Sequence, residues 1–218
     1  MKYKKLILVF TLIIMAFVYI GYPYIKDQKE NIDGLKRNII RFHVIANSDS
    51  EDDQALKLKI RDRILNEMGE QFENSSSIDE SRKIIESNMD TLKYIVEDEI
   101  KKEGKDYIAQ VYLGEDDFPT KSYGGITFPA GEYEALKVVI GEGKGKNWWC
   151  VMFPPLCFVD ITHGISGDVQ EELKEVLSED EYELILSDKK PHMKLKFKTV
   201  EIFEKTKTQF AKLFIGEN

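Results

Sequence analysis

Residues 141–160 read Gly-Glu-Gly-Lys-Gly-Lys-Asn-Trp-Trp-Cys-Val-Met-Phe-Pro-Pro-Leu-Cys-Phe-Val-Asp. It holds both tryptophans of the chain, both cysteines and two of the six prolines. Three alternating glycines begin it, and a dense apolar run ends it. Aromatic residues and paired prolines beside a glycine-rich segment are typical of an ordered loop, either buried as a plug or presented to a partner.

The composition limits the fold and the class of partner. A chain of 218 residues with 42% hydrophobic residues suits one domain with a real core, with or without a tail. Acidic residues outnumber basic ones by 39 to 31. Because phosphate binding needs a basic surface, this balance argues against nucleic acid and against an anionic membrane surface as partners. Solubility is the simplest explanation of the acidity.

Residues 1–25 have the pattern of an export segment. A positive start comes first, formed by Lys2, Lys4 and Lys5. No charged residue follows from Leu6 to Ile25, and the strongly apolar part, Leu6 to Ile20, fits a signal-peptide core but is short for a membrane span of roughly 20 residues. We therefore expect a signal peptide or an uncleaved membrane anchor, with the basic end cytoplasmic and the body exported. Residues 26–38 are expected to form a tether or a short helix.

The first expected strand and helix lie next to each other. Residues 39–46 are rich in β-branched side chains, which favours a strand. The polar cluster Asn47–Ser50 ends it and caps the helix that follows, since Ser50 and Asp53 have capping-box spacing. Apolar residues at four-residue steps give that helix one buried face. They are Leu56, Ile60, Ile64 and Met68.

The rest of the chain predicts a second helix, a meander of strands and a mixed end. The helix runs from Ser77 to about Gly104. Strands are expected over 107–113, 121–128 and 133–140, with turns at 114–117 and 129–131. Helices are expected over 168–177, 179–186 and 200–214, and a strand over 193–197. Short turns favour antiparallel pairing. The prediction is an α+β fold: a small, mainly antiparallel sheet with helices packed on one face, in a single extracytoplasmic domain over 39–218.

Known catalytic and cofactor motifs are absent from the sequence. There is no Gly-x-Ser-x-Gly elbow, and the three alternating glycines before Lys146 lack the spacing of a phosphate loop. The histidines, His43, His163 and His192, are far apart in sequence. We therefore expect no enzyme, no cofactor and no metal. The alternative is a secreted cysteine- or metal-dependent hydrolase that uses Cys150 or Cys157 with His43 or His163.

The two cysteines favour a disulfide. In an oxidising compartment Cys150 and Cys157 can close a small loop, and Pro154-Pro155 restricts the chain between them. Such a short ring stabilises by ~2–3 kcal/mol if it is unstrained. The alternative is a pair of buried thiols that pack like small hydrophobic side chains.

Two stretches together resemble one family, the stage II sporulation protein R family of endospore-forming bacteria. The first reads Arg-Phe-His-Val-Ile-Ala-Asn-Ser-Asp-Ser over 41–50, with Asp53 and Gln54 after it. The second runs from Gly124-Gly125 through Pro129–Leu136 to the Asn-Trp-Trp-Cys and Pro-Pro-Leu-Cys pieces that end at Cys157. The resemblance covers roughly residues 38–160.

The resemblance implies a role in signalling. Members of the family are made in the forespore and exported into the space between the two septal membranes. There they trigger a membrane-embedded, aspartic-type protease of the mother cell, which removes the pro-sequence of a sigma factor. By this resemblance the chain is a ligand of a protein partner and has no catalytic residues.

The residues expected to contact the partner come from the strand-end loop and the aromatic stretch. Tryptophans often anchor interfaces. Adjacent residues of an extended chain face opposite ways, so one tryptophan is expected to face the core. The expected contact residues are Asn47, Ser48, Asp49, Ser50, Asn147, Trp148, Trp149, Phe153, Pro154 and Pro155.

Overall fold

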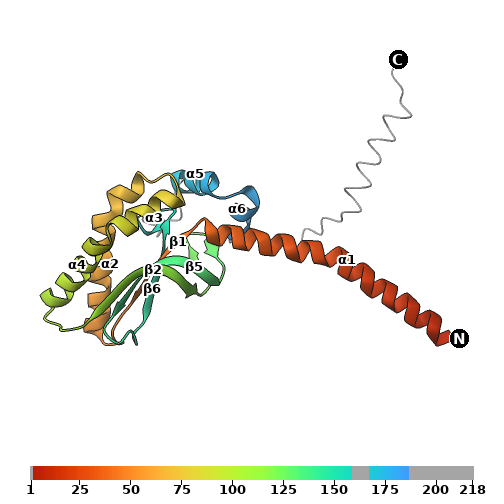
Figure 1. Cartoon of the computed structure of the whole chain (residues 1–218), viewed down its shortest axis with the longest axis horizontal. Coiled ribbons are helices and arrows are strands. Elements are labelled where there is room, and N and C mark those ends of the chain that lie inside the picture. The colour runs from red at the N-terminus through yellow and green to blue at the C-terminus, as the bar shows by residue number, and fades with distance from the viewer. Residues whose placement is uncertain (1, 159–166, 187–218) are drawn as a thin grey trace, which may run out of the picture. The chain divides into compact units, whose positions relative to one another are not determined.

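The structure is a computed structural model that describes residues 2–158 and 167–186 (Figure 1). Two compact units divide the chain: Ile32–Asp188 form one, and Met1–Asn31 belong to the other. Helix α1 spans Lys2–Arg37, so the range expected to be a tether or a short helix is helical almost to its end. Many of its large apolar side chains between Ile7 and Tyr22 are exposed. Within the described residues, no helix carries a stretch long and apolar enough to cross a membrane.

A four-stranded sheet forms the centre of the larger unit. Its strands lie in the order β2 (Ala109–Phe118), β5 (Gly131–Ile140), β1 (Ile40–Ile45) and β6 (Asn147–Phe153). β5 pairs antiparallel with β2 and parallel with β1, and β1 pairs antiparallel with β6. The residues expected to form an aromatic loop therefore include an edge strand, because the apolar run from Trp148 onward pairs with β1.

Three helices pack on one face of this sheet (Figure 1). They are α2 (Glu51–Glu73), α3 (Ile78–Ser87) and α4 (Met89–Lys102). Their apolar stripes meet alternate residues of β1 and β5, including Phe42, Val44 and Val138, in one buried cluster. The predicted α+β fold with a mainly antiparallel sheet is confirmed, and α2, α3 and α4 form the helix layer on this face.

The predicted cap at Ser50 is present, and two further serines cap helices. The hydroxyl of Ser50 accepts a hydrogen bond from the Asp53 backbone N–H at 3.2 Å, and Ser77 does the same for Glu80. Ser178 forms a complete capping box at the start of α6 (Glu179–Ile185). The prediction of one helix from Ser77 to Gly104 is wrong, because α3 and α4 break at Asn88. The side-chain amide of Asn88 donates to the Ile84 carbonyl at 2.8 Å, a local bond that competes with helix continuation.

The predicted meander is also wrong in part. The turn expected over 114–117 is the second half of β2, where pairing with β5 overrides the local turn residues. The strand expected over 121–128 is a hairpin in a sheet of its own, made of β3 (Lys121–Tyr123) and β4 (Ile126–Phe128). Gly124 and Gly125 join its strands with φ of 52° and 99°, as a tight hairpin turn requires.

A second buried cluster lies on the other side of the sheet. It joins the sheet residues Tyr133, Ala135 and Val151 to the hairpin, to α6 and to α5 (Gly167–Val176). The helices expected over 168–177 and 179–186 match α5 and α6 closely. The strand and helix expected over 193–197 and 200–214 lie outside the described residues.

Candidate functional site

Two segments that are far apart in sequence meet at one end of the sheet. Pairing of β1 with β6 places Ile45 opposite Asn147. Beyond this pair, the backbone N–H of Gly145 donates to the Ala46 carbonyl at 2.9 Å, and that of Lys144 donates to the Asn47 carbonyl at 3.1 Å. We call residues Asn47–Ser50 and Gly141–Asn147 the loop surface. The structure therefore brings together five of the expected contact residues: Asn47, Ser48, Asp49, Ser50 and Asn147.

Side chains of the first segment hold the backbone of the second. The Asn47 Oδ1 accepts from the Glu142 N–H at 2.9 Å, and the Asp49 Oδ1 accepts from the Lys146 N–H at 2.7 Å. The glycine run makes this geometry possible. Gly141 and Gly143 have φ of 58° and 61°, where other residues are strained. At Gly145 a Cβ would collide with the Ser48 carbonyl.

The carboxylate of Asp53 stabilises the loop surface through hydrogen bonds. This buried carboxylate accepts hydrogen bonds from the Ser48 hydroxyl at 2.6 Å, the Asn47 amide at 2.9 Å and the Tyr107 hydroxyl at 3.1 Å. Burial acts to raise the pKa of Asp53, but these bonds together with the one from Ser50 outweigh it and lower the pKa. An ionised carboxylate with several donors fixes the loop in one conformation.

The outer side of the loop surface carries exposed side chains that are acidic, basic or polar and uncharged. They are Asp49, Ser50, Glu142, Lys144, Lys146 and Asn147. Lys144 and Glu142 form an exposed ion pair at 2.8 Å, which adds little stability in water. The loop surface is therefore a fixed backbone with exposed polar side chains on it.

The two tryptophans point to opposite faces of the sheet, as expected for neighbours on a strand. Trp148 packs edge-on against Phe42, with 5.6 Å between ring centroids, and the Arg61 guanidinium lies 5.0 Å from its ring. Trp149 stacks on His43 at 5.6 Å, and the Lys121 ammonium lies 4.1 Å from its ring. Both tryptophans are half-buried, so each has part of its surface inside the domain.

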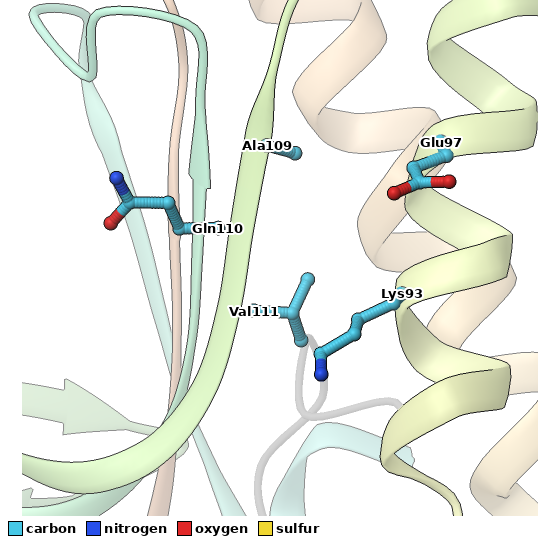
Figure 2. A pocket seen from close by; sticks show the side chains of 5 residues that line it. All are labelled: Lys93, Glu97, Ala109, Gln110 and Val111. Carbon is cyan, nitrogen blue, oxygen red and sulfur yellow. The ribbon is translucent and has the colours of Figure 1, made fainter.

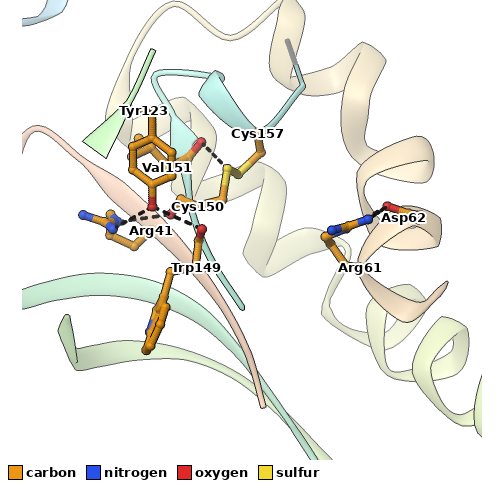
Figure 3. The surroundings of a disulfide bond; sticks show 8 residues. All are labelled: Arg41, Arg61, Asp62, Tyr123, Trp149, Cys150, Val151 and Cys157. Carbon is orange, nitrogen blue, oxygen red and sulfur yellow. Dashed lines mark hydrogen bonds and ion pairs between the residues drawn. A yellow bond between two sulfur atoms is a disulfide. The ribbon is translucent and has the colours of Figure 1, made fainter. Parts of the chain in front are cut away.

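The remaining expected contact residues lie at the other end of β6 and are buried. Phe153, Pro154 and Pro155 belong to the segment between Cys150 and Cys157. A disulfide joins these two cysteines, whose Cα atoms are 5.6 Å apart (Figure 3). The disulfide expected from the sequence is thus present in the structure. Because buried side chains offer no surface to a partner, we leave Phe153, Pro154 and Pro155 out of the candidate site.

Sequence reasoning missed a polar cluster on the face of the sheet away from α2–α4. The His43 Nδ1 lies 2.5 Å from the Asp116 carboxylate, and the Lys137 ammonium donates to the same carboxylate at 2.6 Å. The His43 Nε2 lies 3.0 Å from the Asn147 Oδ1, so the cluster reaches the loop surface. Burial acts to raise the pKa of Asp116, but the bonds from Lys137 and His43 lower it overall.

Sequence reasoning also missed a buried guanidinium in an aromatic cage. Arg41 has no exposed surface, and its Cζ lies 4.4 Å from the Phe118 ring and 5.1 Å from the Tyr133 ring. Its Nε donates to the Cys150 carbonyl at 3.1 Å, and its Nη2 donates to the Tyr123 hydroxyl at 3.2 Å (Figure 3). The sequence showed only a single arginine within an apolar strand. That pattern does not identify the residues that contact its guanidinium.

The hydrolase alternative finds no assembled site in the described residues. Both cysteines are in the disulfide, so neither thiol is free as a nucleophile. Both ring nitrogens of His43 already have polar partners. His163 and His192 lie outside the described residues. Within the described part of the chain, no three His, Cys, Asp or Glu side chains are grouped as metal ligands.

Comparisons with known proteins show which family the chain resembles. A sequence model of the family described as stage II sporulation protein R matches residues 36–163. Over 149 residues the chain is 43% identical to the stage II sporulation protein R of Bacillus subtilis (strain 168). The match covers 68% of this chain and 66% of that protein. No solved structure matches significantly.

Proposed function

The chain belongs to the stage II sporulation protein R family, and we propose that it is an exported signalling ligand in sporulation. Membership supports the role in sporulation. In the proposal, the body of the protein lies in the space between the forespore and mother-cell membranes. There it binds and activates a membrane-embedded, aspartic-type protease of the mother cell, and that protease processes a pro-sigma factor. The protein itself is not an enzyme.

The observation that carries the ligand mechanism is the loop surface. It brings together Asn47–Ser50 and Asn147, which come from the two stretches that resemble the family and are about a hundred residues apart in sequence. Its backbone is held by side-chain hydrogen bonds from Asn47 and Asp49 and by the buried Asp53. A ligand needs such a fixed surface because ordering a flexible loop on binding lowers the affinity.

The basic and apolar start of the chain supports export. Lys2, Lys4 and Lys5 precede an uncharged run, and the apolar side chains that follow in α1 are exposed. An exposed apolar helix with a basic start suits insertion by the export machinery, either as a signal peptide or as an anchor. This proposal predicts that the compact unit from Ile32 onward is the part that meets the partner.

Co-purification of the full chain with the extracytoplasmic region of the protease tests the proposal. The informative variant is the charge reversal Lys144→Glu with Lys146→Glu, because both side chains are exposed on the loop surface. We expect the wild type to bind and this variant to bind about tenfold more weakly. Alanine substitutions of Trp148 and Trp149 are less informative, because both rings also pack inside the domain.

The matched control is a second double reversal, Lys83→Glu with Lys101→Glu, at exposed positions on α3 and α4. It changes the net charge equally but lies outside the loop surface, so its binding should equal that of the wild type. Processing of the pro-sigma factor in sporulating cells should follow the same order. Absence of binding by the wild type, or equal loss in both variants, would overturn the proposal.

A further inference from the structure

One edge of the central sheet is open. Within the described residues, β2 pairs with β5 on one side and with no strand on the other. The Ile108 carbonyl accepts a hydrogen bond from the Gly141 N–H at 2.9 Å, so the backbone of Ile108 points toward β5. Because this direction alternates along an antiparallel strand, the N–H and C=O groups of the odd-numbered residues point outward. They are Ala109, Val111, Leu113, Glu115 and Asp117.

The first half of this edge lacks the usual protection against pairing. Natural edge strands carry lysine, proline or a bulge, whereas residues 108–113 are uncharged and pair with β5 in regular register. Outside α1, the exposed large apolar side chains of the described residues are Leu58, Tyr94, Ile108 and Tyr112. Ile108 is 83% exposed, and it lies with Tyr112 on the face of β2 opposite to Val111.

A cleft adjoins the same edge on the helix side. It has a volume of about 280 Å³ and lies between α4 and β2 (Figure 2). Ala109 and Val111 point into it from β2, and Lys93 and Glu97 face it from α4, whereas Gln110 points away. A strand added beside β2 would therefore place alternate side chains in this cleft and the others against Ile108 and Tyr112.

The second half of the edge carries unbalanced negative charge. Glu115 lies opposite Glu134 on β5, and Asp117 lies opposite Glu132. Arg82 neutralises Glu134, with a bond of 2.7 Å. Within the described residues, no ion pair neutralises Glu115, Asp117 or Glu132. Like charges directly opposite each other destabilise a sheet, so a cation beside this end would be favourable.

We propose that the open edge of β2 binds an extended segment of a partner protein as an added strand. The segment has apolar side chains at alternate positions and a lysine or arginine beside Glu115 and Asp117. Backbone hydrogen bonds supply affinity, and the cleft and the acidic end supply specificity. The inference goes beyond the proposed function, because it uses no residue of the loop surface and does not depend on the identity of the protease.

A second copy of the chain fits this edge less well. A copy brings its own acidic strand and a net charge of −8, so two edges repel each other. A basic partner is attracted instead. The charge therefore favours a partner segment over self-pairing.

Fluorescence anisotropy with labelled peptides and the full chain tests the proposal. The first probe is a nine-residue peptide of alternating valine and threonine with a lysine at each end, and the second has glutamate at both ends. We expect the lysine peptide to bind about three- to tenfold more tightly, since exposed ion pairs contribute only modestly in water. The double variant Glu115→Lys with Asp117→Lys should reverse this preference.

Ile108→Ser should weaken binding of the lysine peptide about threefold or more, because the apolar contact shrinks. The matched control, Leu58→Ser, removes an exposed apolar side chain on α2 and should leave binding unchanged. Failure of both peptides to bind, an unchanged preference in the reversed variant, or equal effects of the two serine variants would each overturn the proposal. So would a dimer in sedimentation that Ile108→Ser abolishes, because the occupant would then be a second copy.

Discussion

Arg41 and Phe42 are neighbours on β1, yet they point to opposite faces of the sheet and have very different surroundings. Phe42 faces α2–α4 within a cluster made of apolar side chains. Arg41 faces the other way, where a fully buried guanidinium meets aromatic rings, one tyrosine hydroxyl and one carbonyl. His43, on the same face, binds the Asp116 carboxylate. One face is therefore packed by apolar side chains alone, whereas the other combines an apolar cluster with buried polar contacts.

The difference shows that burial alone does not measure what a residue contributes. Removing a large apolar side chain loses its burial and leaves a cavity, and both effects destabilise the fold. A buried charge is different, since its bonds must first offset the loss of water. Within the described residues, Arg41 has no carboxylate partner, and its Nη1 is buried without a hydrogen bond. We therefore expect an apolar replacement of similar volume to be tolerated at Arg41, whereas truncation of Phe42 should destabilise the fold.

The largest expected effect is on the apolar face. Phe42→Ala should lower the free energy of unfolding by about 3–5 kcal/mol, because the ring leaves a cavity under α2. Arg41→Met keeps most of the volume and removes the buried charge, so it should cost less than about 1 kcal/mol or stabilise the protein. Urea denaturation monitored by tryptophan fluorescence and by circular dichroism measures both.

A comparison of Arg41→Ala with Arg41→Met separates the effect of side-chain volume from that of the charge. Arg41→Ala removes both, so it should destabilise more than Arg41→Met does, through the cavity among Phe118, Tyr123 and Tyr133. If Arg41→Met costs as much as Phe42→Ala, the hydrogen bonds to Tyr123 and Cys150 stabilise the fold more than we infer, and the contrast between the faces is lost.

The next effect concerns the disulfide, which ties the apolar face to the turn after β6. Cys150 is buried in the cluster under the helices, and Cys157 packs against the same cluster. The double variant Cys150→Ser with Cys157→Ser should lower the free energy of unfolding by ~2–3 kcal/mol, because the reduced chain gains freedom when unfolded. Dithiothreitol should destabilise the wild type similarly and leave the variant unaffected. Equal sensitivity of both would show that the effect is not the disulfide.

The third prediction concerns how the stability contributed by the polar face depends on pH. Asp116→Asn should lower the free energy of unfolding by about 1.5–3 kcal/mol at pH 7, because Lys137 and His43 lose an ionised acceptor. The pKa of Asp116 is lowered in the folded state, so its contribution is present above the unfolded pKa of about 3.9 and is lost as the pH falls through the folded pKa.

The stability difference between wild type and Asp116→Asn should therefore shrink below about pH 4. Asp106→Asn is the matched control, since Asp106 is exposed and should show no comparable difference at either pH. A gap between wild type and Asp116→Asn that is unchanged from pH 7 to pH 3 would mean that the carboxylate charge does not stabilise this face.

The difference between local and long-range contacts explains which parts of the fold could be predicted from the sequence. Apolar periodicity and capping residues gave β1, α2 and α6, because those signals lie within a few residues of each other. The length of β2 was missed because Gly114–Asp117 look like a turn locally and become a strand only by pairing with β5. His43 and Asp116 are 73 residues apart, so no local pattern could join them.

The candidate site shows the same division. The glycine run and the segment Asn47–Ser50 were recognisable as unusual, and their residue types suggested loops and a cap. That they form one surface follows from the register of β1 and β6, which depends on the whole sheet. Phe153 and the two prolines had the same residue-type signal, but Phe153 pairs with Ile40 inside the sheet and the two prolines after it are buried.

The smallest effect separates the role of Ser50 as a cap from its place on the loop surface. Ser50→Ala removes the acceptor for the Asp53 N–H and should cost about 1 kcal/mol. Ser77→Ala removes the equivalent cap of α3, away from the loop surface, and should cost a similar amount. Because both variants lose comparable stability, any difference between them in binding the protease region reports on the surface itself. Lower affinity for Ser50→Ala alone would place Ser50 in the contact, whereas equal affinity would restrict it to capping α2.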